Sequence, residues 1–392
     1  MESPLRRRGR IVKRGNTWSF IVDVKPEGAP GRDQLRRGGF TTKREAQNAL
    51  TDALANLQGG VFAKPQKLTV ATYLDAWLAA MTTAGRRPTT LHGYRRHIEA
   101  HVIPALGDHQ LQLLTALDLD RLYADLIANG RKNGNGGLSP RTVRYIHSIL
   151  RKALSDAERK GIIVRNVATL ASPPSTSSTR PPEMRVWTPA QTREFLALAF
   201  ENTGTQPYAL LFRLATTTGM RRGELCGLRW NDTDLDTGRL SIRHQITTAG
   251  EHVIEADVKT NRARRVIDVD EQTISRLRAH RTEQLQLRLA VGSGWNNNDL
   301  VFCQPDGRPL HPNTVSQAFD RLIARSHLPR IRFHDLRHGH ASQLLAAGVN
   351  AKVVSERLGH ASVAFTLDTY AHVMPGQQRA AAIAAAALID GN

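Results

Sequence analysis

Four short segments in the second half of the chain carry polar residues of the types that phosphate chemistry needs. Arg221 lies in the first, within residues 218–225, where a tight turn runs into a helix. Such a turn brings backbone N–H groups and an arginine to one place, and a guanidinium can grip two phosphate oxygens at once. Lys259 lies in the second, near the tip of a predicted hairpin, from which a long side chain can enter a groove.

The other two segments add histidines, a second arginine and a tyrosine. His334 and Arg337 stand at the start of a predicted helix and share one face, because residues three apart do so. His360 precedes Tyr370 by ten residues. Phosphodiester cleavage needs an in-line nucleophile, charge neutralisation at the non-bridging oxygens and a proton for the leaving oxygen. The side chains of these four segments cover all three needs.

The charge of the whole chain points to a polyanionic partner. Its 392 residues include 54 Lys and Arg against 35 Asp and Glu, which gives a net charge of +19 and a pI near 10.8. Nucleic acid is the leading partner and an anionic membrane surface the second. No apolar run reaches the roughly 18 residues of a membrane span, and no apolar segment follows the basic N-terminus as in a signal peptide. With only Cys226 and Cys303, the composition predicts a cytoplasmic, multidomain, nucleic-acid-binding protein.

Residues 1–64 are predicted to form a small β-rich module. Alternating apolar residues indicate a strand over 18–24, and Thr42 with Glu45 has the spacing of a capping box at a helix start. The module holds 13 Lys and Arg against 6 Asp and Glu, and the basic residues ahead of the strand resemble a flexible arm. We expect DNA contact from these residues, rather than a tail that only aids solubility: Arg6, Arg7, Arg8, Arg10, Lys13 and Arg14.

Residues 65–172 are predicted to be a bundle of four short helices. Apolar positions at helical spacing alternate with basic ones, and Ser139-Pro140 is a typical helix start. Basic outer faces would let the bundle lie against a phosphate backbone, although they could also serve only to keep it soluble. The residues singled out for DNA contact are Arg95, Arg96, Arg141 and Arg144.

A Pro-, Ser- and Thr-rich linker over 173–186 precedes a third domain, 187–392, in which helices surround one short sheet. Its strands are expected near 240–246, 252–258 and 264–269. The nearly all-alanine stretch 380–388 predicts a terminal helix. The chain is therefore expected to be multidomain and mainly α, with a β-rich N-terminal module, a helical bundle and a mixed α+β domain carrying a small antiparallel sheet.

The order of the polar residues resembles the tyrosine recombinase, or phage integrase, family, whose pattern is Arg…Lys…His-x-x-Arg…His…Tyr. The positions that match it are Arg221, Lys259, His334, Arg337, His360 and Tyr370. Glu224 and His338 fit the surrounding pattern and are taken as structural support. The resemblance implies an arm-type DNA-binding module at 1–64, a SAM-like core-binding domain at 65–172 and a catalytic domain at 187–392.

Each matching residue has an expected role in DNA cleavage. Tyr370 would attack the phosphate, and by the resemblance it would leave a 3′-phosphotyrosyl link with a free 5′ hydroxyl. Lys259 would protonate the 5′ oxygen, and His334 would act as the base for Tyr370 or support the transition state. The two arginines would neutralise the non-bridging oxygens, with a hydrogen bond added by His360. Because the link conserves the bond energy, no ATP, metal or other cofactor is expected.

Double-stranded DNA with core and arm-type attachment sites is the expected partner, bound by a homotetramer with a possible DNA-bending or directionality factor. Integration and excision of a phage or mobile element, in the bacterial cytoplasm at the nucleoid, is the expected setting. Two other classes share features: a type IB topoisomerase has the same catalytic groups, and a non-catalytic DNA-binding regulator has the same charge. A metal site at His338 and His340 is a weaker alternative, because neither cysteines nor a carboxylate trio lie nearby.

Overall fold

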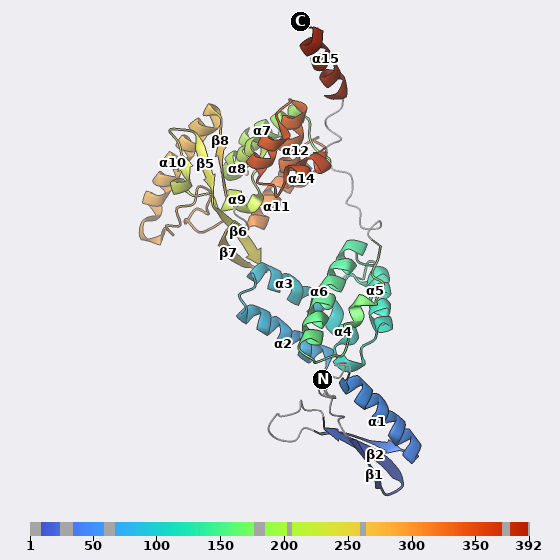
Figure 1. Cartoon of the computed structure of the whole chain (residues 1–392). Helices are drawn as coiled ribbons and strands as arrows, with labels where there is room; N and C mark the ends of the chain where they lie inside the picture. The colour runs from blue at the N-terminus through green and yellow to red at the C-terminus, as the bar shows by residue number, and fades with distance from the viewer. Residues whose placement is uncertain are drawn as a thin grey trace, which may run out of the picture. The chain divides into compact units, whose positions relative to one another are not determined.

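The chain divides into two compact units, 1–181 and 182–392 (Figure 1). A computed structural model describes residues 9–23, 34–58, 67–132, 134–175, 185–201, 206–258, 264–370 and 377–390. Helices predominate and the sheets are small and antiparallel, so the predicted fold class is confirmed. Among the described residues no helix has the length and apolar character needed to cross a membrane. The predicted linker 173–186 contains the division, and most of it lies outside the described residues. The three predicted domain boundaries stay predictions.

The N-terminal module is an antiparallel sheet of order β1-β2-β3 with one helix packed on it. Its core is small and centres on Phe20, Val22 and Leu50. Thr42 and Glu45 exchange the predicted capping hydrogen bonds at the helix start. Its elements are β1 (Gly9–Arg14), β2 (Thr17–Asp23), β3 (Gln34–Phe40) and α1 (Lys43–Gln58).

One expectation for this module was wrong. Residues 9–14 form a strand and are no flexible arm, because Ile11 packs on the core and the strand pairs with β2 over its whole length. Gly15, at a φ of +56°, makes the tight turn between the two strands. The arginines at 6–8 lie outside the described residues.

The second part of the first unit is the predicted helical bundle. Ser139 caps α6 as expected, and Thr115 caps α5 through a full capping box with Asp118. A π-helical turn and a short helix, which the periodicity did not predict, follow the second long helix directly. The elements are α2 (Val70–Thr83), α3 (Pro88–His97), the π-helical turn Ile98–Val102, α4 (Ile103–Leu106), α5 (Ala116–Asn129) and α6 (Pro140–Arg159).

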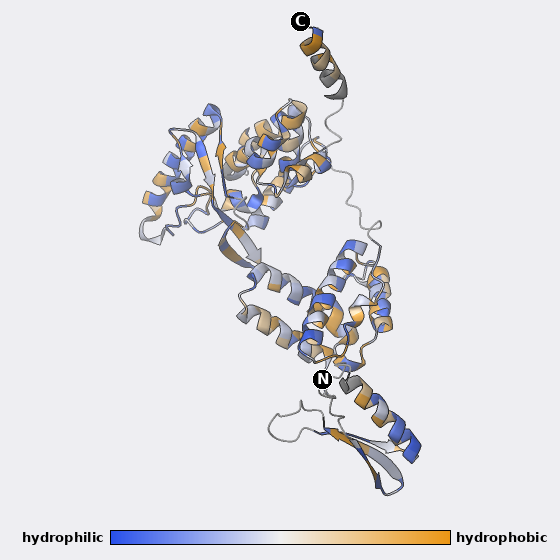
Figure 2. Ribbon diagram, in the orientation of Figure 1, coloured by the Kyte–Doolittle hydropathy of each residue, from blue (hydrophilic) through white to orange (hydrophobic). Residues whose placement is uncertain are grey.

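Helix α6 shows how the sequence pattern builds this bundle. Val143, Ile146 and Leu150 are buried on one face, while Arg141 is exposed on another. The helix is therefore amphipathic, and Figure 2 shows both hydrophobic and hydrophilic residues along it. The buried hydroxyl of Tyr73 donates to the carbonyl of Ala153 at 2.6 Å, which ties α2 to α6.

The second unit packs helices around a core of aromatic rings. Phe195, Phe212 and Phe319 are fully buried and contact one another at ring separations of 5.2–5.8 Å. Figure 1 shows α7, α8, α12 and α14 gathered on one side of this unit. Its helices are α7 (Pro189–Glu201), α8 (Gln206–Thr218), α9 (Arg222–Cys226), α10 (Glu271–Val291), α11 (Pro312–Ala324), α12 (Asp335–Ala346), α13 (Ala351–Leu358), α14 (Val363–Tyr370) and α15 (Gln377–Asp390). The last of these confirms the predicted alanine-rich helix.

The strands of this unit correct the predicted single sheet. They form two sheets, one of order β4-β5-β8 and one of β6 with β7. The predicted strand 240–246 is interrupted at Arg243, which the pattern hid because its apolar residues keep the same even-numbered phase on both sides. The strands are β4 (Thr233–Asp234), β5 (Arg239–Ile242), β6 (His244–Ala249), β7 (His252–Asp257) and β8 (Arg265–Asp268).

The pairing also changes the setting of Lys259. Strands β7 and β8 pair with β6 and β5, and in the described part of the chain they do not pair with each other. The predicted hairpin of strands 252–258 and 264–269 is therefore wrong, and Lys259 itself lies outside the described residues.

Candidate active site

The turn that carries Arg221 depends on one glycine. Helix α8 ends at Thr218, and Gly219 has a φ of +65° that reverses the chain so that Arg221 becomes the N-cap of α9. A Cβ on Gly219 would lie 2.5 Å from a methyl carbon of Leu358 and 2.7 Å from the ring of His340, so no larger residue fits. This close approach brings the turn against α12 and the end of α13.

Arg337 is held in the protein interior by two backbone carbonyls. Its Nη1 donates to the carbonyl of Gly219 and its Nη2 to that of Leu358, both at 2.7 Å. The residue is only 4% exposed, and burial lowers its pKa to about 9, so the guanidinium is still charged at neutral pH. The contacts fix its plane before any phosphate binds.

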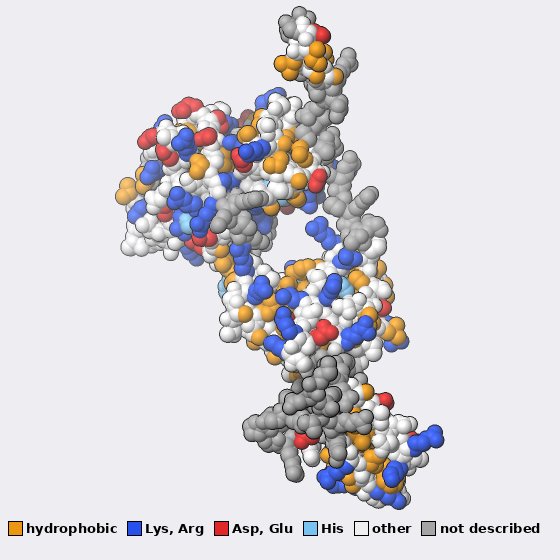
Figure 3. Space-filling model, in the orientation of Figure 1, with side chains coloured by type: hydrophobic (Ala, Val, Ile, Leu, Met, Phe, Trp, Pro, Cys, Tyr) orange, Lys and Arg blue, Asp and Glu red, His pale blue; other side chains and the backbone are white. Residues whose placement is uncertain are grey.

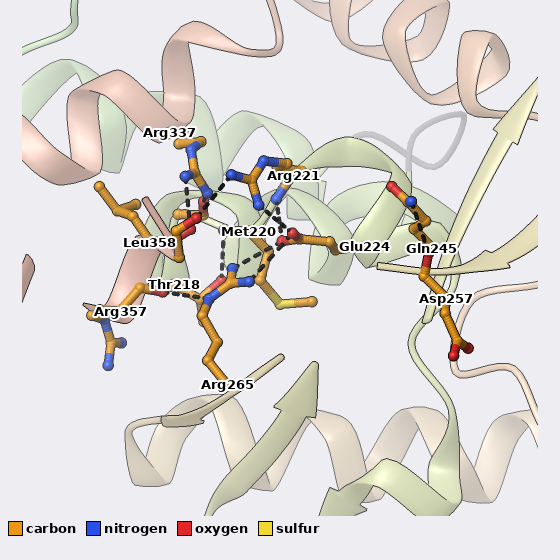
Figure 4. Close-up of polar contacts among 12 residues, drawn as sticks. Thr218, Met220, Arg221, Glu224, Gln245, Asp257, Arg265, Arg337, Arg357 and Leu358 are labelled. Atoms are coloured by element: carbon orange, nitrogen blue, oxygen red, sulfur yellow. Dashed lines mark hydrogen bonds and ion pairs between the residues drawn. The ribbon is translucent and has the colours of Figure 1, made fainter. Parts of the chain in front are cut away.

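Arg221 is held beside Arg337 by the carbonyl of Gly359, the residue that follows Leu358 at the end of α13. Its Nη2 donates to the carbonyl of Gly359 at 3.1 Å, and its Nη1 pairs with Glu224 at 2.6 Å (Figure 4). Gly359 closes α13 in the left-handed conformation, which turns the last carbonyls of the helix toward the two arginines. Each terminal guanidinium nitrogen has two N–H groups, so one contact apiece leaves donors for phosphate oxygens.

Glu224 contacts Arg221 and also a residue that the sequence did not single out for the site. Its side chain is 1% exposed and receives Nη2 of Arg265 at 2.8 Å. Although burial alone would raise it, the pKa of Glu224 is lowered by hydrogen bonds and charge from Arg265 and then Arg221. A period-two pattern could have revealed Arg265, which is in phase with the buried Ile267 on β8.

Tyr370 ends α14 and is buried, with 1% of its surface exposed. Its hydroxyl lies 2.7 Å from Nδ1 of His338, and burial raises its pKa to about 12, an effect that the charge of Arg337 opposes. The phenol is therefore neutral at pH 7 and can donate to His338 when that ring is protonated on Nε2. The sequence pointed to His334 as the base or as support for the transition state, whereas the structure places His338 at the hydroxyl.

His334 and His360 lie close to helix ends: His334 immediately precedes α12, and His360 follows the residue that caps α13. His334 is the N-cap residue of α12, and its ring meets that of His338 edge-on at 5.1 Å. Nδ1 of His360 lies 2.8 Å from the hydroxyl of the buried Thr366 on α14. Burial, and then the charge of Arg337, lowers the pKa of His360 to about 3, so this ring is neutral at physiological pH.

Lys259 lies outside the described residues, but both neighbours of its segment are fixed. The N–H of Val258 donates to the carbonyl of Arg243 at 3.1 Å, and Arg264 pairs with Asp257 at 2.7 Å.

Family models match the chain along most of its length. The phage integrase family matches residues 185–376, the phage integrase N-terminal SAM-like domain 69–127 and the arm DNA-binding domain 10–57. The chain is 30% identical over 356 residues to an integrase of Streptomyces ambofaciens, a match that covers 87% of this chain and 85% of that protein. The chain belongs to the phage integrase family. It is a tyrosine recombinase, as the sequence predicted, and the topoisomerase and regulator alternatives are set aside.

Other relatives agree. The recombinase is 27% identical over 371 residues to a tyrosine recombinase XerC-like protein of Caldanaerobacter subterraneus, over 89% of this chain and 92% of that one. Among solved structures it resembles the Tn1549 transposon integrase in complex with a circular intermediate DNA, at a TM-score of 0.62 and 22% identity, over 80% of this chain and 98% of that one. A lambda integrase dimer bound to a core site gives a TM-score of 0.54 at 20% identity, over 92% and 94%. These structures establish the shared fold.

The residues predicted to contact DNA differ in their solvent exposure and in their contacts within the recombinase. Arg10, Lys13 and Arg14 are exposed on β1, as are Arg95, Arg96 and Arg141 on the bundle helices, where Figure 3 shows many Lys and Arg side chains. Arg144 is half-buried and donates to the carbonyl of Pro174 at 2.6 Å. Arg144 therefore has a structural role, because it ties α6 to the chain at Pro174.

His340 is a buried structural histidine of the recombinase. Its Nδ1 lies 3.0 Å from the carbonyl of Thr216, which only accepts, so Nδ1 must donate and Nε2 accepts from Nε of Arg357 at 3.2 Å. The ring is held neutral and tied to α8, whereas His338 contacts Tyr370. The two histidines thus have different partners, and among the described residues no group of three or more potential metal ligands occurs.

Acid is expected to destabilise the second unit because folding lowers the pKa of His340. Burial, and then the charge of Arg357, lowers the pKa of His340 to about 4, against roughly 6.5 in the unfolded chain. The unfolded state therefore takes up the proton first, and the stabilisation is complete above pH 6.5 and lost as the pH falls toward 4. Thermal unfolding of full-length protein over this range should show a shallower pH dependence for His340→Gln than for wild type. The control His252→Gln, at an exposed site on β7, should follow wild type; parallel curves for all three proteins would contradict the assignment.

Proposed function

We propose that this recombinase is the integrase of a phage or other mobile element, and that it joins two attachment sites through a 3′-phosphotyrosyl link at Tyr370. The observation that carries the proposal is the pair of arginines, Arg221 and Arg337, held side by side by the carbonyls of Leu358 and Gly359. Two fixed guanidiniums with N–H groups to spare suit the two non-bridging oxygens of one phosphate.

The cleavage step follows from these groups. The oxygen of Tyr370 attacks phosphorus, a P–O bond to tyrosine forms, and the bond from phosphorus to the 5′ oxygen breaks. The phenolic proton passes to a base, for which His338 is the nearest group, and the 5′ oxygen takes a proton from Lys259. Rejoining reverses the step with the 5′ hydroxyl of another strand, so energy input is unnecessary. His360 donates a hydrogen bond to the phosphate, and His334 supports the transition state.

Tyr370 must leave its buried position before it can attack. Among the described residues it belongs to a cluster of five buried apolar residues on α12, α13 and α14, separate from the large core of the unit. Because this cluster is separate from the large core, release of Tyr370 leaves that core intact. We infer that binding of site DNA exposes the tyrosine.

A two-site assay tests the proposed function. Full-length protein is mixed with two plasmids that carry the sites found in the DNA bordering the gene, in a buffer with EDTA and without ATP. Recombinant joints are the expected product. Relaxed plasmids without recombinant joints would contradict the proposal and favour a topoisomerase activity instead.

The N-terminal module is proposed to bind a second, arm-type class of DNA site. Its described core consists of its own residues, and the bundle core uses none of them, so removal of 1–64 should leave the bundle folded. The truncated protein should keep its core-site footprint and lose the outlying one. Counterion release predicts a shallower salt dependence of binding for it. Identical footprints of full and truncated proteins would contradict the two-site proposal.

The assembly is proposed to be a homotetramer on DNA, aided by a DNA-bending or directionality factor, at the nucleoid of the bacterial host. Helix α15 supports exchange between subunits, because Ile383, Leu388 and Ile389 are exposed on it. An apolar helix face in water gains from burial on a neighbouring copy.

A further inference from the structure

Arg265 has all three guanidinium nitrogens engaged inside the protein. Its side chain is 6% exposed; Nη2 and Nη1 lie 2.8 and 3.3 Å from the two carboxylate oxygens of Glu224, and Nε donates to the carbonyl of Arg357 at 2.6 Å. A fork of this kind is the geometry that arginine provides and lysine does not. Its contacts, drawn in Figure 4, are with the residues that hold the catalytic arginines.

The same carboxylate holds Arg221. Oε1 of Glu224 accepts from Nη1 of Arg221 at 2.6 Å, and Oε2 accepts from the backbone N–H of Arg221 at 2.9 Å. One buried negative charge is thus shared by two arginines. With Arg265 in place, the group formed by Arg221, Arg265 and Glu224 carries a net positive charge. Without Arg265, Glu224 would balance the charge of Arg221, and the attraction of Arg221 for phosphate would fall.

The end of α13 adds a second connection. Three consecutive carbonyls there each accept from a different arginine: that of Arg357 from Arg265, that of Leu358 from Arg337 and that of Gly359 from Arg221. Carbonyls in the last turn of a helix have no partner within the helix, so this end is suited to hold cations. Arg265 is the member of the set that begins β8, directly after the segment that carries Lys259.

We propose that Arg265 is a positioning residue for DNA cleavage, which orients Arg221 through Glu224 and keeps the positive charge of Arg221 available to the scissile phosphate. This role rests on the proposed function of the site. It differs from direct phosphate binding, because all three guanidinium nitrogens of Arg265 already contact the carboxylate of Glu224 or the carbonyl of Arg357. Its loss should therefore resemble the loss of Arg221 in kind.

The test uses the full-length chain and a nicked core-site duplex in which the covalent adduct accumulates. Two substrates are compared, one with the normal scissile phosphate and one with a methylphosphonate there, in each stereoisomer. The methyl group removes the negative charge that the arginines neutralise. Arg265→Ala should form the adduct about 100-fold more slowly than wild type on phosphate, the size of effect seen when one transition-state donor is removed. On methylphosphonate it should come within a few-fold of wild type.

Control variants separate the possible outcomes. Arg221→Ala should show the same rescue, while Arg239→Ala, which removes an exposed arginine paired with Asp268, should match wild type on both substrates. If Arg265→Ala does not fold, Arg265→Lys keeps a cation without the fork and should show a smaller defect with the same rescue. Equal losses on both substrates, or no loss on phosphate, would overturn the role of Arg265. Failure of wild type to form any adduct would instead refute the proposed function.

Discussion

Replacing Tyr370 with phenylalanine is expected to reduce covalent adduct formation on nicked site DNA to the background of a protein-free control. The substitution removes only the attacking oxygen. Because the hydroxyl also contacts His338, the folded protein loses one hydrogen bond, a cost of about 1 kcal/mol. Site binding should stay within a few-fold of wild type, since the substitution keeps the ring and removes one hydroxyl. SDS gel electrophoresis of labelled DNA measures the adduct, and mobility shift measures binding.

Tyr208→Phe is the matched control for this variant. It removes a hydroxyl from α8 in the same unit, at a ring that stacks on Phe212, and should leave adduct formation unchanged. Undiminished adduct in Tyr370→Phe would show that another group attacks the phosphate.

Lys259→Ala is expected to cleave ordinary site DNA roughly 10²- to 10⁴-fold more slowly, the usual range for loss of a general acid. An alkoxide leaving group has a conjugate acid with a pKa near that of water, about 15.7, and departs poorly without a proton. A thiolate, with a reference pKa of about 8.5, departs unaided. The same variant should therefore cleave DNA with a bridging 5′ sulfur at close to the wild-type rate.

Arg221→Ala is the informative contrast, because its charge acts on the non-bridging oxygens and a better leaving group does not replace it. Sulfur should not rescue that variant. If sulfur also fails to rescue Lys259→Ala, Lys259 contacts the backbone phosphate only and the general acid lies elsewhere.

Local signals in the sequence predicted where some helices begin. The helix starts at Thr42 and Ser139 were recognisable because capping depends on residues within one turn. The matched positions Arg221, Arg337 and Tyr370 lie close together in the fold. The resemblance to the family pattern, which rests on the order of these residues along the chain, had predicted this proximity. Their catalytic roles remain proposals.

The remainder depended on tertiary contacts that periodicity does not encode. The two sheets were predicted as one because the apolar phase continues through Arg243. The partner of Tyr370 was assigned to His334, although a helical spacing of four places His338 beside it and only packing of α14 on α12 decides between them. Arg265 was not singled out, because its burial against Glu224 depends on a residue 41 positions away.

Mapping the covalent link tests the central claim most directly. Wild-type protein is reacted with nicked site DNA, the adduct is digested with nuclease and protease, and the peptides are sequenced by mass spectrometry. A nucleotide attached through a 3′ phosphate to Tyr370, and to no other residue, is the predicted result. A nucleotide on any other side chain, or a 5′ phosphate link, would contradict the proposed mechanism.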